Sequence, residues 1–346
     1  MKSLVRMASF LAAFTILGFA QQQAERTIPA RTIPVPSTVS PELRKVIAPA
    51  WSGSKSPMTL TNDEWKALQK RTDEGRAKAL QPVKQKFQVS VQEETIAGVR
   101  VYRVKPQSIA TGNRNRLLVH VHGGAYVFGG GESAASEAVL MANFGEIEVV
   151  SVDYRMPPDF PFPAALDDAL AVWKEIAGSR DAKNLGLFGT STGGGLTLAM
   201  VLKLKELKMP LPGAIMAGTP WSDMTKTGDT FYTNELVDNV LGSNDGLLEA
   251  AAKLYAGKHD LKEPLLSPVY GDMTNFPPVI LLSGTRDLFL SNTVRVHQKL
   301  LQAGSVAELL VFEGQSHAQY TFAPDAPETA AAWNEVSKFF DRHLGR

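Results

Sequence analysis

Cysteine is absent from the 346-residue chain. The protein therefore has no disulfide framework, no thiolate metal site and no cysteine to carry a lipid. Hydrophobic residues make up 44% of the chain and charged residues 21%, which is ordinary for a globular protein and ample for a large core. These values predict one large domain, or one domain with an additional segment outside it.

A long apolar run occurs only at the N-terminus, in "MKSLVRMASFLAAFTILGFA", residues 1–20. Lys2 and Arg6 precede the run, and Gly18 to Ala20 supply a small-x-small end, which is the layout of a secretory signal peptide. A membrane anchor is the alternative, but this run has about 14 residues where a span needs roughly 20. We expect cleavage near Ala20, no stable membrane span, and export to the periplasm or medium.

Neither sign of charge dominates. Loss of the leader with Lys2 and Arg6 leaves 34 of the 36 basic residues against 35 acidic ones. This balance gives no reason to expect a nucleic-acid or polyanion partner. A small neutral substrate fits the composition better.

We expect residues 21–60 to form a proline-rich N-terminal strap. The stretch "RTIPARTIPVPSTVSP" repeats Thr-Ile-Pro and should be extended, without a core of its own. The main domain is expected over residues 61–346. Its first helix should begin at Thr61, because Thr61 and Glu64 have the spacing of a capping box and helix formers continue to Leu80.

The remaining pattern predicts the α/β class. From Phe87 apolar residues alternate on either side of Ala97-Gly98, which indicates an antiparallel strand pair. Six apolar runs without alternation follow; they end at His122, Tyr154, Gly189, Gly218, Gly284 and Gly314. Helical patterns at 163–177, 194–208 and 292–303 separate several of them. Such strands form a mostly parallel sheet with helices on both faces.

Residues 222–264 interrupt this rhythm, since they hold no strand-like run and are too long for a bare loop in a compact domain. Together with residues 40–80 they are expected to form a helical cap over the carboxyl edge of the sheet. A disordered insertion is the alternative, although Leu236, Val240, Leu247 and Leu254 offer apolar anchors.

Ser191 is the candidate nucleophile. In "GLFGTSTGGG", residues 186–195, it follows an apolar strand and precedes a helix, with Gly189 and Gly193 two residues to either side. This G-x-S-x-G pattern is typical of a nucleophile elbow, whose sharp turn excludes larger side chains. A phosphate-binding loop is disfavoured because no lysine precedes the serine.

A serine nucleophile needs a base and an orienting carboxylate. His317 follows the last predicted strand and Asp287 follows the one before it, so both fall at the carboxyl edge that carries Ser191. Asp287 could instead cap the following helix, and Asp223, after the strand that ends at Gly218, is the alternative triad acid.

The run "HVHGGAYVFGGG" supplies backbone N–H groups at the end of another strand. Gly123, Gly124 and Ala125 are the expected oxyanion-hole donors from this loop, and Thr192, directly after the serine, is the further donor. His120 and His122 alternate and could share a metal, but no third ligand of suitable spacing follows. We expect His122 to hold the glycine loop by hydrogen bonding, and we expect no metal and no cofactor.

These motifs resemble those of the bacterial hormone-sensitive-lipase-like (family IV) carboxylesterases, which have the α/β-hydrolase fold. The resemblance runs from about Arg116 to Arg346 and includes the glycine loop, the elbow, "VDYRMPPDFPFPAALDDAL" at 152–170, "TPWSDM", and the contexts of Asp287 and His317. It implies Ser191 as nucleophile, His317 as general base and then acid, and Asp287 as its orienting partner. It also implies an oxyanion hole from the glycine loop and Thr192, and a helical cap.

Three departures from the family pattern stand out. Ala125 replaces the usual third glycine, and its φ angle is expected to be negative. Thr192 stands where alanine is usual. Asp287 is followed by "LFLSN" without the usual second acidic residue.

The sequence thus predicts an exported serine carboxylesterase for short- to medium-chain esters, with a small-molecule ester as its partner and a homodimer among its expected assemblies. Two alternatives remain open. A lactonase or amidase would use the same triad, and a non-catalytic ligand-binding homologue would share the fold.

Overall fold

The computed structural model describes residues 27–345. It divides into two units, one ending at Pro34 and the other comprising Val35–Arg346. Within the first unit, residues 27–34 contain no helix or strand. The expected signal peptide at residues 1–20 lies outside the described residues, and the helices and strands described all belong to the second unit.

One eight-stranded sheet forms the centre of this unit. Its strands are β1 (Ser90–Ile96), β2 (Val99–Lys105), β3 (Leu117–Val121), β4 (Val149–Val152), β5 (Leu185–Thr190), β6 (Ala214–Gly218), β7 (Val279–Gly284) and β8 (Ala307–Phe312). They lie in the order β1-β2-β4-β3-β5-β6-β7-β8. The pairs β1–β2 and β2–β4 are antiparallel and all other pairs are parallel. The predicted hairpin and the six later strands are confirmed.

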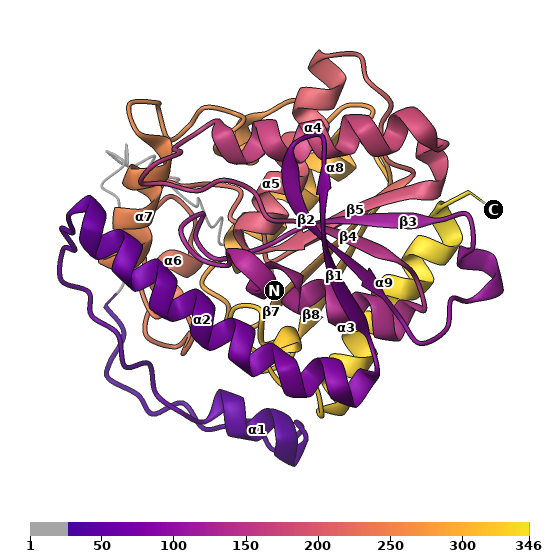
Figure 1. Cartoon of the computed structure of the whole chain (residues 1–346). Coiled ribbons are helices and arrows are strands. Elements are labelled where there is room, and N and C mark those ends of the chain that lie inside the picture. The colour runs from indigo at the N-terminus through magenta and orange to yellow at the C-terminus, as the bar shows by residue number, and fades with distance from the viewer. Residues whose placement is uncertain (1–26, 346) are drawn as a thin grey trace, which may run out of the picture. The chain divides into compact units, whose positions relative to one another are not determined.

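Helices cover both faces of the sheet (Figure 1). One face carries α3 (Ser136–Gly145) and α9 (Pro327–His343), and the other carries α4 (Ala164–Ser179), α5 (Thr192–Glu206) and α8 (Leu290–Gln302). Alternate strand residues enter separate apolar clusters: Val119 packs with α4, α5 and α8, whereas Leu118 packs with α3 and α9. The central strands are buried on both sides, which explains why their sequences do not alternate.

The N-terminal part of this unit contains α1 (Pro41–Ile47) and the long α2 (Asn62–Phe87). The capping box is confirmed: the Glu64 N–H donates to Thr61 Oγ1 at 3.3 Å, and the Thr61 N–H donates to Glu64 Oε2 at 2.7 Å. Helix α2 continues through Pro82 beyond the predicted end near Leu80. Helix α1 buries Leu43 in a small apolar cluster, so the C-terminal part of the proline-rich segment has a packed face.

The segment between β6 and β7 is folded. It contains α6 (Thr230–Thr233) and α7 (Leu247–Ala256), and Ala251 of α7 is buried in a cluster with Trp65 of α2 and Phe128 of the glycine loop. Short 3-10 turns occur at Thr111–Asn113, Gly131–Ala135, Ala182–Asn184, Pro268–Tyr270 and Gln319–Thr321. None of the helices within residues 27–345 is both long and apolar enough to span a bilayer.

Candidate functional site

Ser191 lies in the turn between β5 and α5, at the carboxyl edge of the sheet. Its φ and ψ angles are 64° and −123°, a strained conformation of the kind that is kept at functional sites when the surroundings enforce it. The Ser191 N–H donates to the Gly218 carbonyl at the end of β6 at 2.8 Å. The turn is therefore fixed to the neighbouring strand, with the serine half-exposed at the edge.

The elbow glycines are required by a close approach of backbone. A Cβ atom at Gly189 would lie 2.2 Å from the Val121 carbonyl oxygen at the end of β3, and a Cβ at Gly193 would lie 2.1 Å from the same atom. Real Cβ atoms do not approach oxygen so closely, so any side chain here would force β3 and the turn apart. The small residues around Ser191 thus let the turn sit against the neighbouring strand.

His317 and Asp287 are brought together. Both are buried, and Nδ1 of His317 lies 3.1 Å from Oδ1 of Asp287. Asp287 is itself held, because its Oδ2 accepts the Ser283 hydroxyl at 2.7 Å and its Oδ1 accepts the Phe289 N–H at 2.8 Å. The latter bond lies at the start of α8, so Asp287 contacts the beginning of that helix as well as the histidine. The rings of Phe289 and His317 form a T-shaped pair with centroids 5.0 Å apart.

Thr219, the residue after β6, is a second neighbour of the histidine. Its Oγ1 lies 2.8 Å from Nδ1 of His317 and 3.4 Å from Nε2. Among residues 27–345 no hydrogen bond joins Ser191 to His317, although the Ser191 N–H is bonded to Gly218, directly before Thr219. Bonds between a nucleophile and its base are often long until a substrate is present.

The alternative acid, Asp223, is engaged elsewhere. Its carboxylate is fully buried and contacts Nη1 of Arg295 at 2.6 Å and the Tyr270 hydroxyl at 2.9 Å. Its other oxygen accepts the N–H and hydroxyl of Thr225. These contacts leave Asp287, and not Asp223, beside His317.

The glycine loop after β3 is tightly bent. The Gly124 carbonyl accepts the N–H groups of Val127 at 3.0 Å and Phe128 at 2.8 Å. Gly124 has φ +127°, and a Cβ there would lie 2.1 Å from the Phe128 carbonyl oxygen. A Cβ at Gly123 would lie 3.2 Å from the Cβ of Ser191, so the loop directly faces the serine.

The expectation of a negative φ at Ala125 is wrong. Ala125 has φ 58° and Tyr126 has φ 59°, both in the left-handed region, which costs a non-glycine residue about 1–2 kcal/mol. The two hydrogen bonds to Gly124 require this sharp bend, and Tyr126 stacks on Tyr255 of α7 with ring centroids 3.7 Å apart. Packing and hydrogen bonding outweigh the local preference of alanine.

Four N–H groups at this edge have no protein acceptor within the part of the chain that the structure describes. They belong to the residues named as oxyanion-hole donors: Gly123, Gly124, Ala125 and Thr192. Thr192 begins α5, where N–H groups are unpaired and the helix dipole is positive. The edge can therefore accept negative charge close to Ser191.

His122 contacts the glycine loop. Its Nδ1 donates to the Gly123 carbonyl at 2.9 Å, and its ring stacks on Tyr154 at 3.9 Å. Burial lowers the pKa of His122 to about 3, so the ring is neutral in the working range. His120 instead contacts Ser151 and Glu137. Residues 27–345 contain no group of three or more acidic or histidine side chains placed to hold a metal ion.

Carboxylates also hold the glycine loop from outside. Asp73 of α2 accepts the N–H groups of Gly129 at 2.7 Å and Gly130 at 3.1 Å. Asp153, after β4, accepts the N–H of Gly131 at 3.1 Å, and burial raises its pKa to about 6 against the opposing effect of Arg100. These acceptors connect α2 and β4 to the loop.

Asp238, in the segment between β6 and β7, is a residue that the motifs did not identify. Its carboxylate is fully buried and accepts backbone N–H groups of Leu288 and His317. No local pattern marks these two contacts, because Leu288 and His317 are 50 and 79 residues away from Asp238 in sequence.

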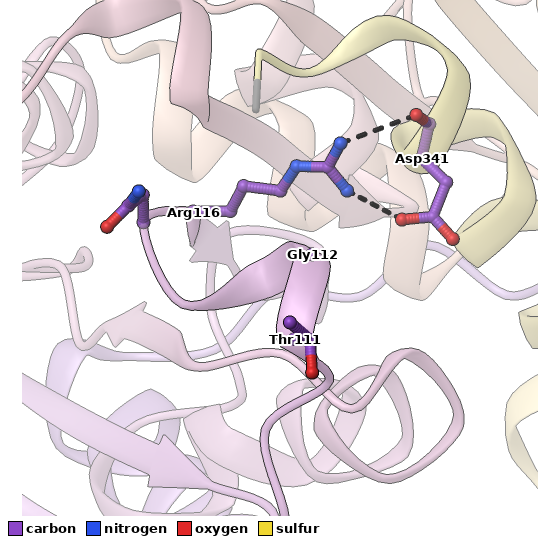
Figure 2. Close-up of a pocket in the computed structure, with 5 residues that line it drawn as sticks. Thr111, Gly112, Arg116 and Asp341 are labelled. Carbon is purple, nitrogen blue, oxygen red and sulfur yellow. Dashed lines mark hydrogen bonds and ion pairs between the residues drawn. The ribbon is translucent and has the colours of Figure 1, made fainter.

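A surface cavity of about 430 Å³ lies elsewhere, at the amino end of β3, the opposite edge of the sheet from Ser191. Figure 2 shows its lining, in which the Arg116 guanidinium reaches Asp341 of α9. The same guanidinium also contacts the Leu344 carbonyl. None of the candidate site residues lines this cavity.

Comparison with known proteins agrees with this fold. A family described by the alpha/beta hydrolase fold matches residues 118–321. An acetyl-hydrolase of Streptomyces hygroscopicus is 29% identical over 231 residues, covering 66% of this chain and 77% of the relative. The crystal structure of an esterase named E25 has a TM-score of 0.90 at 43% identity, covering 93% of this chain and 99% of that one. An esterase from the bacterial hormone-sensitive lipase family has a TM-score of 0.76 at 27% identity, covering 88% and 99%.

The chain therefore belongs to the α/β-hydrolase family. Within it, the protein is an esterase of the hormone-sensitive-lipase-like type, a carboxylic ester hydrolase.

Proposed function

We propose that this esterase is a serine carboxylesterase, with Ser191 as nucleophile, His317 as general base and then acid, and Asp287 as the orienting carboxylate. The observation that carries this proposal is the convergence of three strand ends: Ser191 after β5, Asp287 after β7 and His317 after β8, with His317 Nδ1 on Asp287 at 3.1 Å. The order Ser, Asp, His along the chain is that of α/β-hydrolases.

In the first half of the reaction, Oγ of Ser191 attacks the ester carbonyl carbon while Nε2 of His317 takes the hydroxyl proton. Asp287 keeps the other ring proton on Nδ1 and stabilises the imidazolium that forms. His317 then gives its proton to the departing alkoxide, which leaves as the alcohol. In the second half, His317 activates a water that attacks the acyl-serine and releases the acid.

The negative charge on the tetrahedral intermediate needs donors that are already in place. The unpaired N–H groups of Gly123, Gly124, Ala125 and Thr192 support an oxyanion hole on the Ser191 side of the glycine loop. Loss of one such donor costs about 2.7–4 kcal/mol of transition-state stabilisation. Asp73 and Asp153 accept hydrogen bonds from the N–H groups of the following glycines, and these bonds keep the loop in place.

We also propose that residues 40–80 and 222–264 form the cap that encloses the substrate. The apolar cluster of Trp65, Phe128 and Ala251 supports this, because it packs α2 and α7 against the glycine loop. A closed site favours neutral esters of short to medium acyl length. The leader supports export, with a mature chain that starts near Gln21; N-terminal sequencing of the exported protein tests this, and light scattering tests for a homodimer.

The deciding experiment is hydrolysis of p-nitrophenyl acetate, butyrate, octanoate and palmitate by the mature chain and by Ser191→Ala. We expect turnover of the shorter esters by the wild type and none by the variant. Equal rates on a matched anilide would indicate an amidase, and faster turnover of a lactone a lactonase. A folded wild type that binds esters but hydrolyses none would indicate a ligand-binding homologue and contradict the proposal.

A further inference from the structure

Asp238 contributes a fully buried carboxylate to the immediate surroundings of Asp287 and His317. It comes from the segment between β6 and β7, outside the strand ends that carry the proposed triad. Every hydrogen bond that it makes within residues 27–345 is to backbone. Oδ1 accepts the N–H groups of Val240 at 2.8 Å and Leu241 at 3.0 Å, and Oδ2 accepts those of Leu288 at 2.8 Å and His317 at 3.3 Å.

The two oxygens serve different partners. The bonds of Oδ1 are local and fold the turn that contains Asp238, as aspartates commonly do. The bonds of Oδ2 are not local: one oxygen bridges the residue after Asp287 and the backbone of His317 itself. A turn-forming aspartate does not need this second pair of contacts.

The two bonds of Asp238 Oδ2 affect proton transfer because they hold the backbone next to Asp287 and the backbone of His317. The position of Leu288 fixes the backbone of Asp287, and the His317 N–H fixes the origin of the imidazole. Relative displacement of these backbones would change the 3.1 Å contact between Asp287 Oδ1 and His317 Nδ1. A misplacement of about 1 Å at a reacting group can cost on the order of 10²-fold in rate.

The charge of Asp238 also favours the proton transfer between Ser191 and His317. Burial and the nearby Asp287 carboxylate raise the pKa of Asp238, whereas His317 opposes the rise. The negative form of Asp238 is therefore favoured when His317 carries a positive charge. The imidazolium formed during ester cleavage meets a second buried carboxylate beside Asp287.

We propose that Asp238 is a positioning residue for the esterase reaction, and that its Oδ2 holds the backbones of Asp287 and His317 in register for proton transfer. The segment between β6 and β7 would thus contact the proposed triad through Asp238 as well as contribute to the cap. This inference rests on the proposed function of Ser191, Asp287 and His317.

The test compares Asp238→Ala and Asp238→Asn with Asp260→Asn. Asp260 lies in the same segment and also accepts a backbone N–H, that of Lys262 at 2.9 Å, but it is exposed. On p-nitrophenyl butyrate we expect Asp238→Ala to lower kcat on the order of 10²-fold with KM nearly unchanged. Asp238→Asn keeps one acceptor oxygen and should fall between Asp238→Ala and wild type, and Asp260→Asn should match wild type.

A spectroscopic readout separates positioning from general stability. The proton shared by His317 Nδ1 and Asp287 gives a low-field ¹H NMR resonance, which we expect to shift or broaden in Asp238→Asn and Asp238→Ala but not in Asp260→Asn. If Asp238→Ala does not fold, Asp238→Asn decides both readouts. An unchanged resonance with kcat within about twofold of wild type, in a folded Asp238 variant, would overturn the proposal.

The resonance also separates this inference from the proposed function. Ser191→Ala should lose activity and keep the resonance. If the wild type hydrolyses no ester, the proposed function fails, while the dependence of the resonance on Asp238 still supports or overturns the positioning role.

Discussion

The hydroxyl oxygen of Thr219 lies 2.8 Å from Nδ1 of His317, closer than the nearest carboxylate oxygen of Asp287, at 3.1 Å. Two adjacent strands supply these neighbours, since Thr219 follows β6 and Asp287 follows β7. One ring N–H therefore has two oxygen acceptors. If Asp287 loses its charge, Thr219 remains to hold the same tautomer of the histidine.

This arrangement predicts that Asp287 and Thr219 are energetically coupled. In a serine protease, replacement of the acid by its amide lowers kcat about 10⁴-fold because the histidine adopts the wrong tautomer. We expect a smaller loss in kcat/KM for Asp287→Asn here, and a loss under about tenfold for Thr219→Val. The fold loss in kcat/KM of the double variant should exceed the product of the two single fold losses. Assays of all four proteins on p-nitrophenyl butyrate complete the cycle; independent effects would contradict shared acceptance of the proton.

Gly124→Ala should inactivate the glycine loop without unfolding the domain. The added Cβ would meet the Phe128 carbonyl oxygen at 2.1 Å in a left-handed conformation, so the N–H groups facing Ser191 would turn away. We expect kcat to fall on the order of 10²–10³-fold, the effect of one lost oxyanion donor. Gly178→Ala is the matched control, because its Cβ meets nothing within 4 Å and lies in α4. Equal activity of the two variants would show that the loop is not part of the site.

Asp73 should affect activity although it lies on α2 and does not face Ser191. Its two bonds to Gly129 and Gly130 involve a charged acceptor, and bonds of this kind contribute about 1.5–3 kcal/mol. We expect Asp73→Ala to lower kcat about tenfold or more as the loop loosens. Glu74→Gln is the control and should have wild-type activity, because Glu74 is exposed and its carboxylate comes no closer than 4.0 Å to Lys70 Nζ. A normal kcat for Asp73→Ala would mean that the loop is held sufficiently by Asp153.

We expect His122 to lower the free energy of unfolding of the protein at acid pH. Its pKa is lowered from an ordinary 6.5 to about 3, so the unfolded chain takes up a proton that the folded protein rejects. Its contribution to the free energy of unfolding is complete above pH 6.5 and falls by up to about 1.4 kcal/mol per pH unit as the pH drops toward 3.

The test is urea unfolding at pH 7.5 and pH 5 for wild type and His122→Asn, which keeps an N–H donor near Nδ1 but does not titrate. We expect wild type to lose about 2 kcal/mol more than the variant across this interval. All other titrating groups are common to both proteins. Parallel losses would show that His122 is protonated in the folded state.

Strand pattern and motif spacing were sufficient to predict the sheet and the edge at which the candidate residues meet. Ser191, Asp287 and His317 each follow an apolar run, and parallel strands bring such positions together. The positive φ of Ala125 was not predictable in this way, because the stacking of Tyr126 on Tyr255 and the bonds to Gly124 depend on tertiary packing. Asp238 and Thr219 were not predicted for the same reason: each contacts His317 from a distant part of the chain, with no short motif around it.

The Val121 carbonyl oxygen occupies the space that a side chain at either Gly189 or Gly193 would need, and Val121 directly precedes the loop that begins at His122. The spacing between the Ser191 hydroxyl and the N–H groups of the loop is thus set by two backbones in van der Waals contact. Such a contact does not weaken with added salt, as exposed ion pairs do, and it has no proton to lose. Ionic strength and pH should change the charges in this enzyme while leaving the separation of Ser191 from the N–H groups of the glycine loop as it is.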